Sequence, residues 1–238
     1  MVGARRPVGH AGEFGPESYR SWRGTSLGTI TDELERRLIF RLAGPLQGRA
    51  ALDVGCGDGA LARALGRGGA TPVVGCDLDP GMITQAAGST GGRETPVSYL
   101  LARAEMLPFR DASFDLVTSI TVLAFVPEAA QALGELSRVL RPGGRLVLGD
   151  LGKWSQWAAS RRVRGWLGNE MWQAATFRSA RQMRSLVRAA GLRVDRTAGA
   201  IFAPRCAPIA RLMAPIDASL GDMTTLGAAF IAVRATKV

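Results

Sequence analysis

The feature that most limits the fold is a regular alternation of strand-like and helix-like segments between residues 49 and 151. Five short apolar runs of the kind that form buried strands occur there: RAALDVG, PVVGCD, VSYLLAR, FDLVTSI and RLVLGDL. Segments with helical character, such as GALARALGR, PGMITQAAG and PEAAQALGELSRVL, lie between several of these runs. Because a helix that crosses between two strands leaves them parallel, the alternation predicts a doubly wound α/β fold. Two later runs, LRVDRTAG and AAFIAVRAT, would extend the sheet to seven strands.

The segments before this region predict a flexible lead and one helix. Residues 1–18 are rich in Gly, Pro and Arg and have no apolar periodicity, which is typical of a mobile terminus. Residues 29–43 (TITDELERRLIFRLA) have the periodicity of an amphipathic helix, with Thr31 as the expected N-cap. The apolar face of that helix would carry Leu34, Leu38, Ile39 and Leu42.

The region after residue 152 loses the alternation. Residues 153–177 hold four of the five tryptophans and show no strand pattern. Residues 179–191 (SARQMRSLVRAAG) predict a helix that begins at a capping Ser179 and ends at Gly191. We therefore expect a helical segment inserted after the fifth strand.

The composition is that of one globular domain without disulfides or a metal cluster. The chain has 238 residues, of which 47% are hydrophobic, and this is enough for one sizeable core. Cys56, Cys76 and Cys206 are too few and too widely spaced for a disulfide framework or a metal site, so we expect a reducing, cytoplasmic setting. No apolar run approaches the roughly 20 residues that span a bilayer, and no apolar core follows the two N-terminal arginines.

The net charge of +10 is concentrated in one late segment. Residues 153–211 contain 12 Lys and Arg residues but only two acidic ones, Glu170 and Asp195, whereas acids and bases balance over residues 1–152. We expect an arginine-bearing outer face there. Its residues would be Arg161, Arg162, Arg164, Arg181, Arg184 and Arg188. Such a face would either be solvated or give weak contact with an anionic membrane surface.

The sequence ALDVGCGDGALA at residues 50–61 indicates a nucleotide-like ligand. Gly55, Gly57 and Ala60 formally satisfy a dinucleotide fingerprint, and Asp77 stands where a ribose-binding acid belongs. Two carboxylates, Asp53 and Asp58, however, flank the loop, and they would repel a pyrophosphate at a helix N-terminus. S-adenosylmethionine has a ribose and an adenine but no phosphate, and both its ammonium and its sulfonium are positive. The acids therefore favour S-adenosylmethionine over NAD.

Four motifs in order resemble the class I S-adenosylmethionine-dependent methyltransferases: LDVGCGDGALA, VVGCDLDPGMI, ARAEMLPFRDASFDLVTS and LGELSRVLRPGGRLVLGD. The resemblance covers residues 49–151, and the closest subgroup is the broad one that modifies small molecules and includes the quinone and natural-product methyltransferases. It implies a Rossmann-like seven-stranded sheet, mostly parallel with an antiparallel last strand, plus a helical cap insertion after strand five. The chain would then divide into four parts: a flexible lead and cofactor-closing segment (1–28), the cofactor-binding core (29–152), a helical cap and substrate segment (153–190), and the last strands (191–238).

The resemblance also implies roles for individual residues. Asp77 would accept hydrogen bonds from both ribose hydroxyls, and Glu105 would accept one from the adenine amino group, because Arg103 stands where the family often has an acid. Tyr19 would close over the site and is the one candidate polar group near the acceptor; no other catalytic residue is assigned. The other residues expected at the cofactor are Asp53, Gly55, Gly57, Gly59, Leu78, Met82, Ala104, Ile120 and Thr121.

The acceptor is expected to be a small molecule bound near tryptophans. Methyl transfer from a sulfonium needs mainly alignment and exclusion of water, so a general base is optional. The residues expected to form the acceptor pocket are Trp22, Trp154, Trp157 and Trp172, although the late tryptophans could equally fix a helical cap to the sheet.

Three other functions stay open from the sequence. A methyltransferase for a lipid or membrane-associated acceptor would use the arginine-rich segment. An RNA methyltransferase is disfavoured, because no basic–aromatic nucleic-acid motif is present. A cofactor-binding protein without catalysis would keep the same loop.

Overall fold

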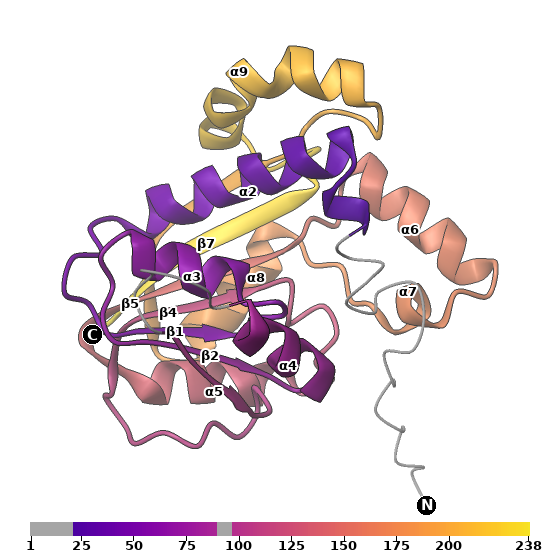
Figure 1. The fold of residues 1–238 in the computed structure, drawn as a ribbon. Coiled ribbons are helices and arrows are strands. Elements are labelled where there is room, and N and C mark those ends of the chain that lie inside the picture. Colours follow the sequence, from indigo (N-terminus) through magenta and orange to yellow (C-terminus); the bar gives the residue numbers. More distant parts are fainter. Residues whose placement is uncertain (1–20, 90–96) are drawn as a thin grey trace, which may run out of the picture.

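The alternating segments form one seven-stranded sheet in the computed structural model, which describes residues 21–89 and 97–238 (Figure 1). The strands are β1 (Ala51–Val54), β2 (Val73–Asp77), β3 (Val97–Leu101), β4 (Phe114–Ile120), β5 (Leu140–Leu151), β6 (Leu192–Ala200) and β7 (Phe230–Lys237). Their order in the sheet is β3-β2-β1-β4-β5-β7-β6. β1 to β5 pair in parallel, whereas β7 runs antiparallel to β5 and β6. The predicted fold class and strand arrangement are confirmed.

Helices cover both faces of the sheet. They are α2 (Ser26–Ala43), α3 (Ala60–Arg67), α4 (Pro80–Gly88), α5 (Ala129–Val139), α6 (Gln156–Trp166), α7 (Glu170–Ala174), α8 (Ala180–Ala189) and α9 (Ala207–Met223). Buried side chains of α5 and α8 join one core cluster, and those of α2 and α3 join another. Ala51 and Leu52 are neighbours in β1 but belong to different clusters. Because successive strand residues point to opposite faces, the two clusters lie on opposite faces of the sheet.

Helix α2 forms with the predicted apolar face but begins earlier than expected. Its expected core residues are all buried: Leu34, Leu38, Ile39 and Leu42. The prediction of Thr31 as N-cap is wrong, because Thr25 holds that position and its side chain accepts a hydrogen bond from Gly28 N at 3.0 Å. Thr31 instead lies inside the helix and donates to Leu27 O at 3.0 Å and to Gly28 O at 2.9 Å.

Helix α8 has the predicted ends but lies against the sheet. Ser179 caps it in a capping box with Gln182, and Gly191 follows with a φ of 78°. Met183 and Val187 are buried in the core cluster that includes α5, and α8 contacts β6 and β7. We expected this helix within the cap of residues 153–190, but its apolar face packs on the sheet, whereas α6 and α7 pack with each other.

Helix α9 lies between β6 and β7, in the last part of the chain, where the sequence predicts only strands. It packs on α2 and β6, and the loop after β6 is tied to it by Asp217. That carboxylate is 2% exposed and accepts hydrogen bonds from Ile201 N at 3.1 Å and Phe202 N at 3.0 Å. Pro215 lies inside α9 and weakens its helical signal in the sequence, so tertiary packing decides its conformation.

A glycine in α9 sets how closely that helix approaches β6. A Cβ atom at Gly221 would lie 1.9 Å from the backbone oxygen of Gly199, so Gly221→Ala must push α9 away from the strand. We expect a loss of about 1–3 kcal/mol in the free energy of unfolding, measured by urea denaturation.

Gly134 provides the matched control for this substitution. It is an exposed glycine inside α5, and a Cβ there would meet no described atom within 4 Å. Gly134→Ala should therefore leave stability unchanged or raise it by about 0.5–1 kcal/mol. If Gly221→Ala proved as harmless as the control, the close approach of α9 to β6 would be refuted.

Candidate functional site

The glycine-rich loop between β1 and α3 takes a conformation that favours glycine. Gly55, Gly57 and Gly59 have φ values of 73°, 54° and 76°, a region in which a side chain is strained. The loop begins where Gly55 N and Cys56 N both donate to Cys76 O, at 2.7 and 2.9 Å. It ends where Gly59 serves as the N-cap of α3. The loop backbone is thus fixed next to the carboxyl end of β2.

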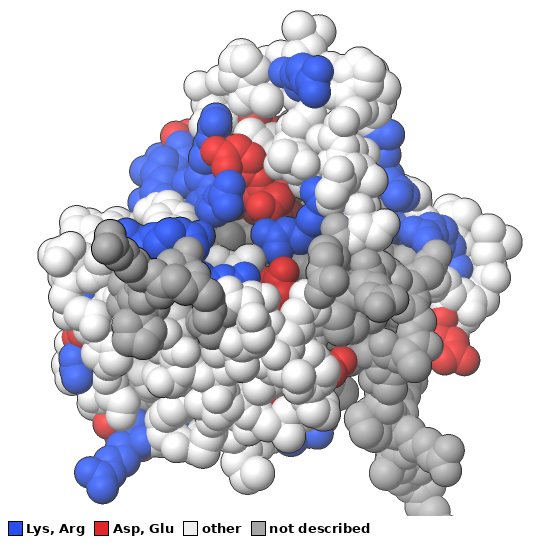
Figure 2. Space-filling model, viewed as in Figure 1, with Lys and Arg blue, Asp and Glu red and all other residues white. Residues whose placement is uncertain are grey.

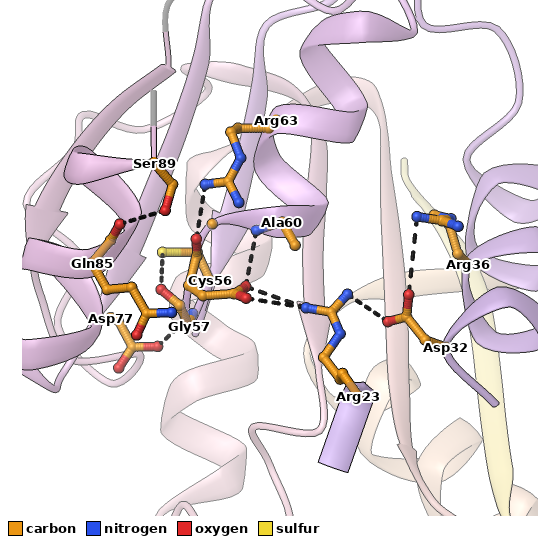
Figure 3. A network of polar contacts seen from close by, with 12 residues as sticks. Arg23, Asp32, Arg36, Cys56, Gly57, Ala60, Arg63, Asp77, Gln85 and Ser89 are labelled. Carbon is orange, nitrogen blue, oxygen red and sulfur yellow. Dashed lines mark hydrogen bonds and ion pairs between the residues drawn. The ribbon is translucent and has the colours of Figure 1, made fainter. Parts of the chain in front are cut away.

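Asp77 at the end of β2 is anchored to this loop. One carboxylate oxygen accepts a hydrogen bond from Gly57 N at 2.9 Å, and the other accepts one from Asp79 N at 3.0 Å (Figure 3). Asp79 in turn caps α4 by accepting from Gly81 N at 2.7 Å. These bonds hold the Asp77 carboxylate in one orientation at the edge of the sheet.

Asp53 in β1 is a buried carboxylate with one unused oxygen. The residue is 2% exposed, and its Oδ1 accepts a hydrogen bond from Thr118 Oγ1 at 2.6 Å. No described group donates a hydrogen bond to its Oδ2. The pKa of Asp53 is raised to about 7, chiefly by burial and also by the negative charges of Asp77 and Asp58, although the hydrogen bond from Thr118 opposes the increase. A cation placed here would favour the ionised form.

Arg23 links the glycine loop to α2. Its guanidinium bridges Asp32, at 2.6 Å, and Asp58, at 3.1 Å (Figure 3). Asp58 also accepts a hydrogen bond from Ala60 N in the first turn of α3, at 3.1 Å. Asp58 is therefore both the helix N-terminal acid that its position indicates and an ion-pair partner of the segment before α2.

A single cavity of about 470 Å³ joins this loop to the aromatic segment after β5. Seven of the residues expected at the cofactor line it: Asp53, Gly55, Gly57, Asp77, Met82, Ile120 and Thr121. Thr121 has a φ of 59°, which is rare for a β-branched residue, and its amide donates to Gly149 O at 2.8 Å. Strained backbone of this kind clusters at functional sites.

Other expected cofactor residues do not line the cavity. They are Gly59, Leu78, Ala104 and Glu105. Leu78 is 47% exposed, and Glu105 forms an ion pair with Arg103 at 3.1 Å. Tyr19 lies outside the described residues. Tyr99 in β3 packs against a core cluster and also contacts the loop, since its hydroxyl group donates to Gly59 O at 3.4 Å.

Aromatic and apolar side chains from the cap form the other half of the cavity. Three of the four expected tryptophans line it: Trp22, Trp157 and Trp172. Trp157 and Trp172 are each 5% exposed, and the Trp172 ring stacks on Phe177 at 6.2 Å between ring centroids. The expected role of Trp154 is wrong: its side chain is 60% exposed, because it precedes the Ser155 cap of α6 and does not share the inner face of that helix.

Two arginines expected on the outer face instead line the cavity. Arg161 and Arg164 follow Trp157 by four and seven residues, so all three share one face of α6. From this spacing the sequence could have predicted that both arginines face the cavity with Trp157. Arg181, Arg184 and Arg188 lie on α8, which packs on the sheet rather than on α6. The arginine-rich segment is therefore divided between the cavity and two separate surfaces.

Further lining residues come from α2 and from the loop before α9. Asp32, Glu35, Arg36 and Ile39 contribute one face of α2, and Arg205 contributes from the later loop. None of these five residues is predicted as a lining residue from the sequence. Their spacing of three and four along α2 marks a common face, but only the fold shows that this face meets the glycine loop.

The geometry fits a ligand with a ribose and a positive charge. Asp77 offers a fixed carboxylate for hydroxyl groups, and Asp53 offers an unused buried carboxylate oxygen for a cation. In agreement with this, residues 52–148 match the family model of a methyltransferase domain (Methyltransf_11). Residues 52–148 of the chain are a methyltransferase domain. A methyltransferase domain agrees with the cofactor that the sequence predicts, S-adenosylmethionine.

Similar proteins place this domain among methyltransferases. The chain is 39% identical over 124 residues to demethylmenaquinone methyltransferase of Clavibacter sepedonicus, which covers 52% of this chain and 50% of that protein. It is 36% identical over 124 residues to 27-O-demethylrifamycin SV methyltransferase of Amycolatopsis mediterranei, which covers 50% and 46%. The chain thus spans about half the length of these curated relatives.

Solved structures show that the likeness of fold extends beyond residues 52–148 to most of the chain. A methyltransferase from Thermotoga maritima superimposes with a TM-score of 0.70 at 21% identity, covering 93% of this chain and 95% of that one. No helix in the described part of the chain is long and apolar enough to cross a membrane.

The raised pKa of Asp53 predicts that cofactor affinity depends on pH. A nearby sulfonium or ammonium favours the ionised carboxylate, so binding should release a proton while free Asp53 is protonated. We expect S-adenosylmethionine affinity to rise with pH, by up to about tenfold per unit, and to level off above about pH 7.

Calorimetry in two buffers with different ionisation enthalpies counts the protons released on binding. Asp53→Asn keeps the shape of the side chain and removes its titration. The variant should therefore show a weaker dependence of cofactor affinity on pH below about pH 7. Other groups that line the cavity, Glu35 above all, stay in place and serve as the internal reference. Equal proton release in the variant and the wild type would exclude Asp53 as the source.

Proposed function

We propose that the protein transfers a methyl group from S-adenosylmethionine to a small molecule with a flat, apolar framework. The observation that supports this is the continuous cavity, which has the glycine loop and Asp77 at one end and Trp157 and Trp172 at the other. A donor at the loop and an acceptor against the tryptophans would lie in one closed space. The named relatives that act on a demethylmenaquinone and on 27-O-demethylrifamycin SV are consistent with an acceptor of this kind.

The cofactor supplies a methyl group on a sulfonium, which is already activated for transfer. The residues of the chain therefore have to bind, orient and exclude water. We assign the ribose to Asp77, the positive end to Asp53, and the methionine chain to the glycine loop with Ile120 and Thr121. Met82 would pack on the adenine.

The segment around Arg23 would close the cofactor half of the cavity. Arg23 neutralises Asp58 and ties it to α2, so this link would keep the loop and the start of α2 together. Trp22, next to it, lines the cavity and would cover the acceptor or the cofactor.

Two measurements test the proposed function. Calorimetry should show binding of S-adenosylmethionine and S-adenosylhomocysteine but not of NAD. A mass-spectrometric screen of phenols, quinols and polyketides with S-adenosylmethionine should then show a product heavier by one methyl group. Binding of NAD without any response to S-adenosylhomocysteine would overturn the assignment of the site.

A further inference from the structure

A carboxylate and a guanidinium face the acceptor half of the cavity without touching. Glu35 on α2 and Arg161 on α6 both line the cavity, and each affects the pKa of the other. No hydrogen bond and no ion pair within 4.0 Å joins these two described side chains. A gap therefore separates two opposite charges in this part of the cavity. Figure 2, in the same view as Figure 1, shows acidic side chains bordered by basic ones on the part of the surface where α2 lies.

Arg161 is held in place by aromatic rings. Its Cζ lies 4.8 Å from the Trp172 ring centre and 5.5 Å from that of Trp157. The Trp157 ring is itself fixed, because its Nε1 donates to Ala203 O at 2.9 Å. A guanidinium that lies over two tryptophan rings is stabilised by cation–π attraction in that position. Arg161 therefore remains beside the gap instead of reaching Glu35.

The two charges respond to burial in opposite ways. Burial lowers the pKa of Arg161 to about 10, so the guanidinium stays charged at neutral pH. The pKa of Glu35 is raised to about 7, chiefly by burial and also by the negative charge of Asp32, although the positive charges of Arg161 and Arg23 oppose the increase. Glu35 can thus take up and release a proton near neutral pH, and its neighbour Arg161 cannot. Arg205, whose Cζ lies 5.4 Å from the Trp157 ring, adds positive charge on the same side.

The walls around the gap suit a flat ring. The lining side chains there are Ile39, Phe125, Leu151, Trp157, Met171 and Trp172. Phe125 and Trp172 lie 6.3 Å apart between ring centroids and belong to one apolar cluster with Leu151. An aromatic or conjugated ring would bury its faces against these side chains, and only a polar edge could use the gap.

We propose that the gap between Glu35 and Arg161 binds an acidic hydroxyl group, a phenol or an enol, carried by a flat apolar acceptor. This proposal rests on the methyl-transfer function proposed above and names the acceptor class for it. The acceptor O–H bond breaks, its proton passes to the Glu35 carboxylate, and the electron pair stays on oxygen, where Arg161 stabilises the negative charge. The methylated product is a neutral ether, and Glu35 then releases the proton to solvent.

Binding of two matched probes tests the acceptor class without turnover. The probes are 4-nitrophenol and its methyl ether 4-nitroanisole, each titrated into the complex with S-adenosylhomocysteine. We expect the phenol to bind about tenfold more tightly or better, because it alone offers the charge-assisted contact. Equal binding of the two probes, or no binding of the phenol, would overturn the proposal.

The absorbance of bound 4-nitrophenol reports which group holds the proton. Arg161→Met should reduce phenol affinity by about tenfold and shift the bound probe toward the neutral phenol, while 4-nitroanisole binds as before. Glu35→Gln should shift the bound probe the other way, toward phenolate, because a competing negative charge is gone. A merely structural role of the two residues would not give shifts of opposite sign.

Arg37→Met is the matched control on the same helix. The Arg37 side chain is 68% exposed and pairs with Glu33, and neither residue lines the cavity, so this variant should leave both probes and their absorbance unchanged. Affinity for S-adenosylhomocysteine is measured in every variant. If that affinity is intact and the probes bind alike, this inference fails alone; if the wild type does not bind S-adenosylhomocysteine, the proposed function fails first.

Discussion

Asp77→Ala is expected to weaken the binding of S-adenosylmethionine by about tenfold or more while the protein stays folded. A hydrogen bond to a charged group contributes on the order of 1.5–3 kcal/mol, and each 1.4 kcal/mol is about a factor of ten in affinity. The carboxylate is held in position by the amides of Gly57 and Asp79, so it can meet the ribose without reorganisation. Removing it also frees Gly57, and the loop should become more mobile.

Calorimetry with S-adenosylhomocysteine measures this effect, and circular dichroism confirms the fold. Asp77→Asn is the graded variant, because an amide keeps one acceptor oxygen but loses the charge. Its affinity should lie between those of the wild type and Asp77→Ala. A folded Asp77→Ala protein with unchanged affinity would show that another residue holds the ribose.

Arg178→Met is expected to cost about 3–5 kcal/mol in the free energy of unfolding. Arg178 is 8% exposed and donates to Leu123 O at 2.6 Å and to Asp150 Oδ2 at 3.3 Å. Asp150 is 1% exposed, so methionine would leave its buried charge without the guanidinium, and only backbone amides such as that of Leu151 would still donate to it. The arginine also joins three parts of the site: the end of β5, the loop after β4 and the chain returning from the cap.

The loss caused by Arg178→Met should grow with pH. Burial raises the pKa of Asp150 to about 6 even with Arg178 present. Without Arg178 the folded state favours protonated Asp150 more strongly, so its pKa rises above both this value and that of the unfolded chain. Stability of the variant then falls as pH increases through that range. Urea denaturation at pH 5 and pH 8 measures the difference.

Arg37→Met is the control for a surface ion pair. The Arg37 side chain is 68% exposed and pairs with Glu33 at 2.7 Å. Exposed pairs of this kind contribute about 0–1 kcal/mol, so the control should change stability little at either pH. A loss for Arg178→Met no larger than that of the control would mean that the buried pair does not hold the cap to the sheet.

The strands and the glycine loop could be predicted because their signals are local. A buried parallel strand is a short apolar run, and a loop that needs positive φ values shows its glycines directly. The acids around the loop indicated a positively charged cofactor without phosphate, and the family match supports S-adenosylmethionine. Helix α8 likewise showed both of its ends, at Ser179 and Gly191.

Other features depended on contacts that the sequence does not show. Helix α9 contains Pro215 and forms because it packs on α2 and β6, with Gly221 allowing the close approach. Trp154 and Arg161 lie on the opposite sides from those expected, because Trp154 precedes α6, whereas Arg161 follows Trp157 by four residues and shares its face. That this face meets the cavity is decided by the packing of α6.

By itself the sequence determined the sheet, the loop and the nature of the cofactor, since each rests on residues close together in the chain. The tertiary structure alone decided what faces the acceptor. Glu35, Arg161 and Arg205 are far apart in the sequence and meet only where α2, α6 and the loop before α9 converge on one cavity. The pKa values of these side chains depend on burial and on neighbouring charges from other elements, and both exist only when the chain is folded.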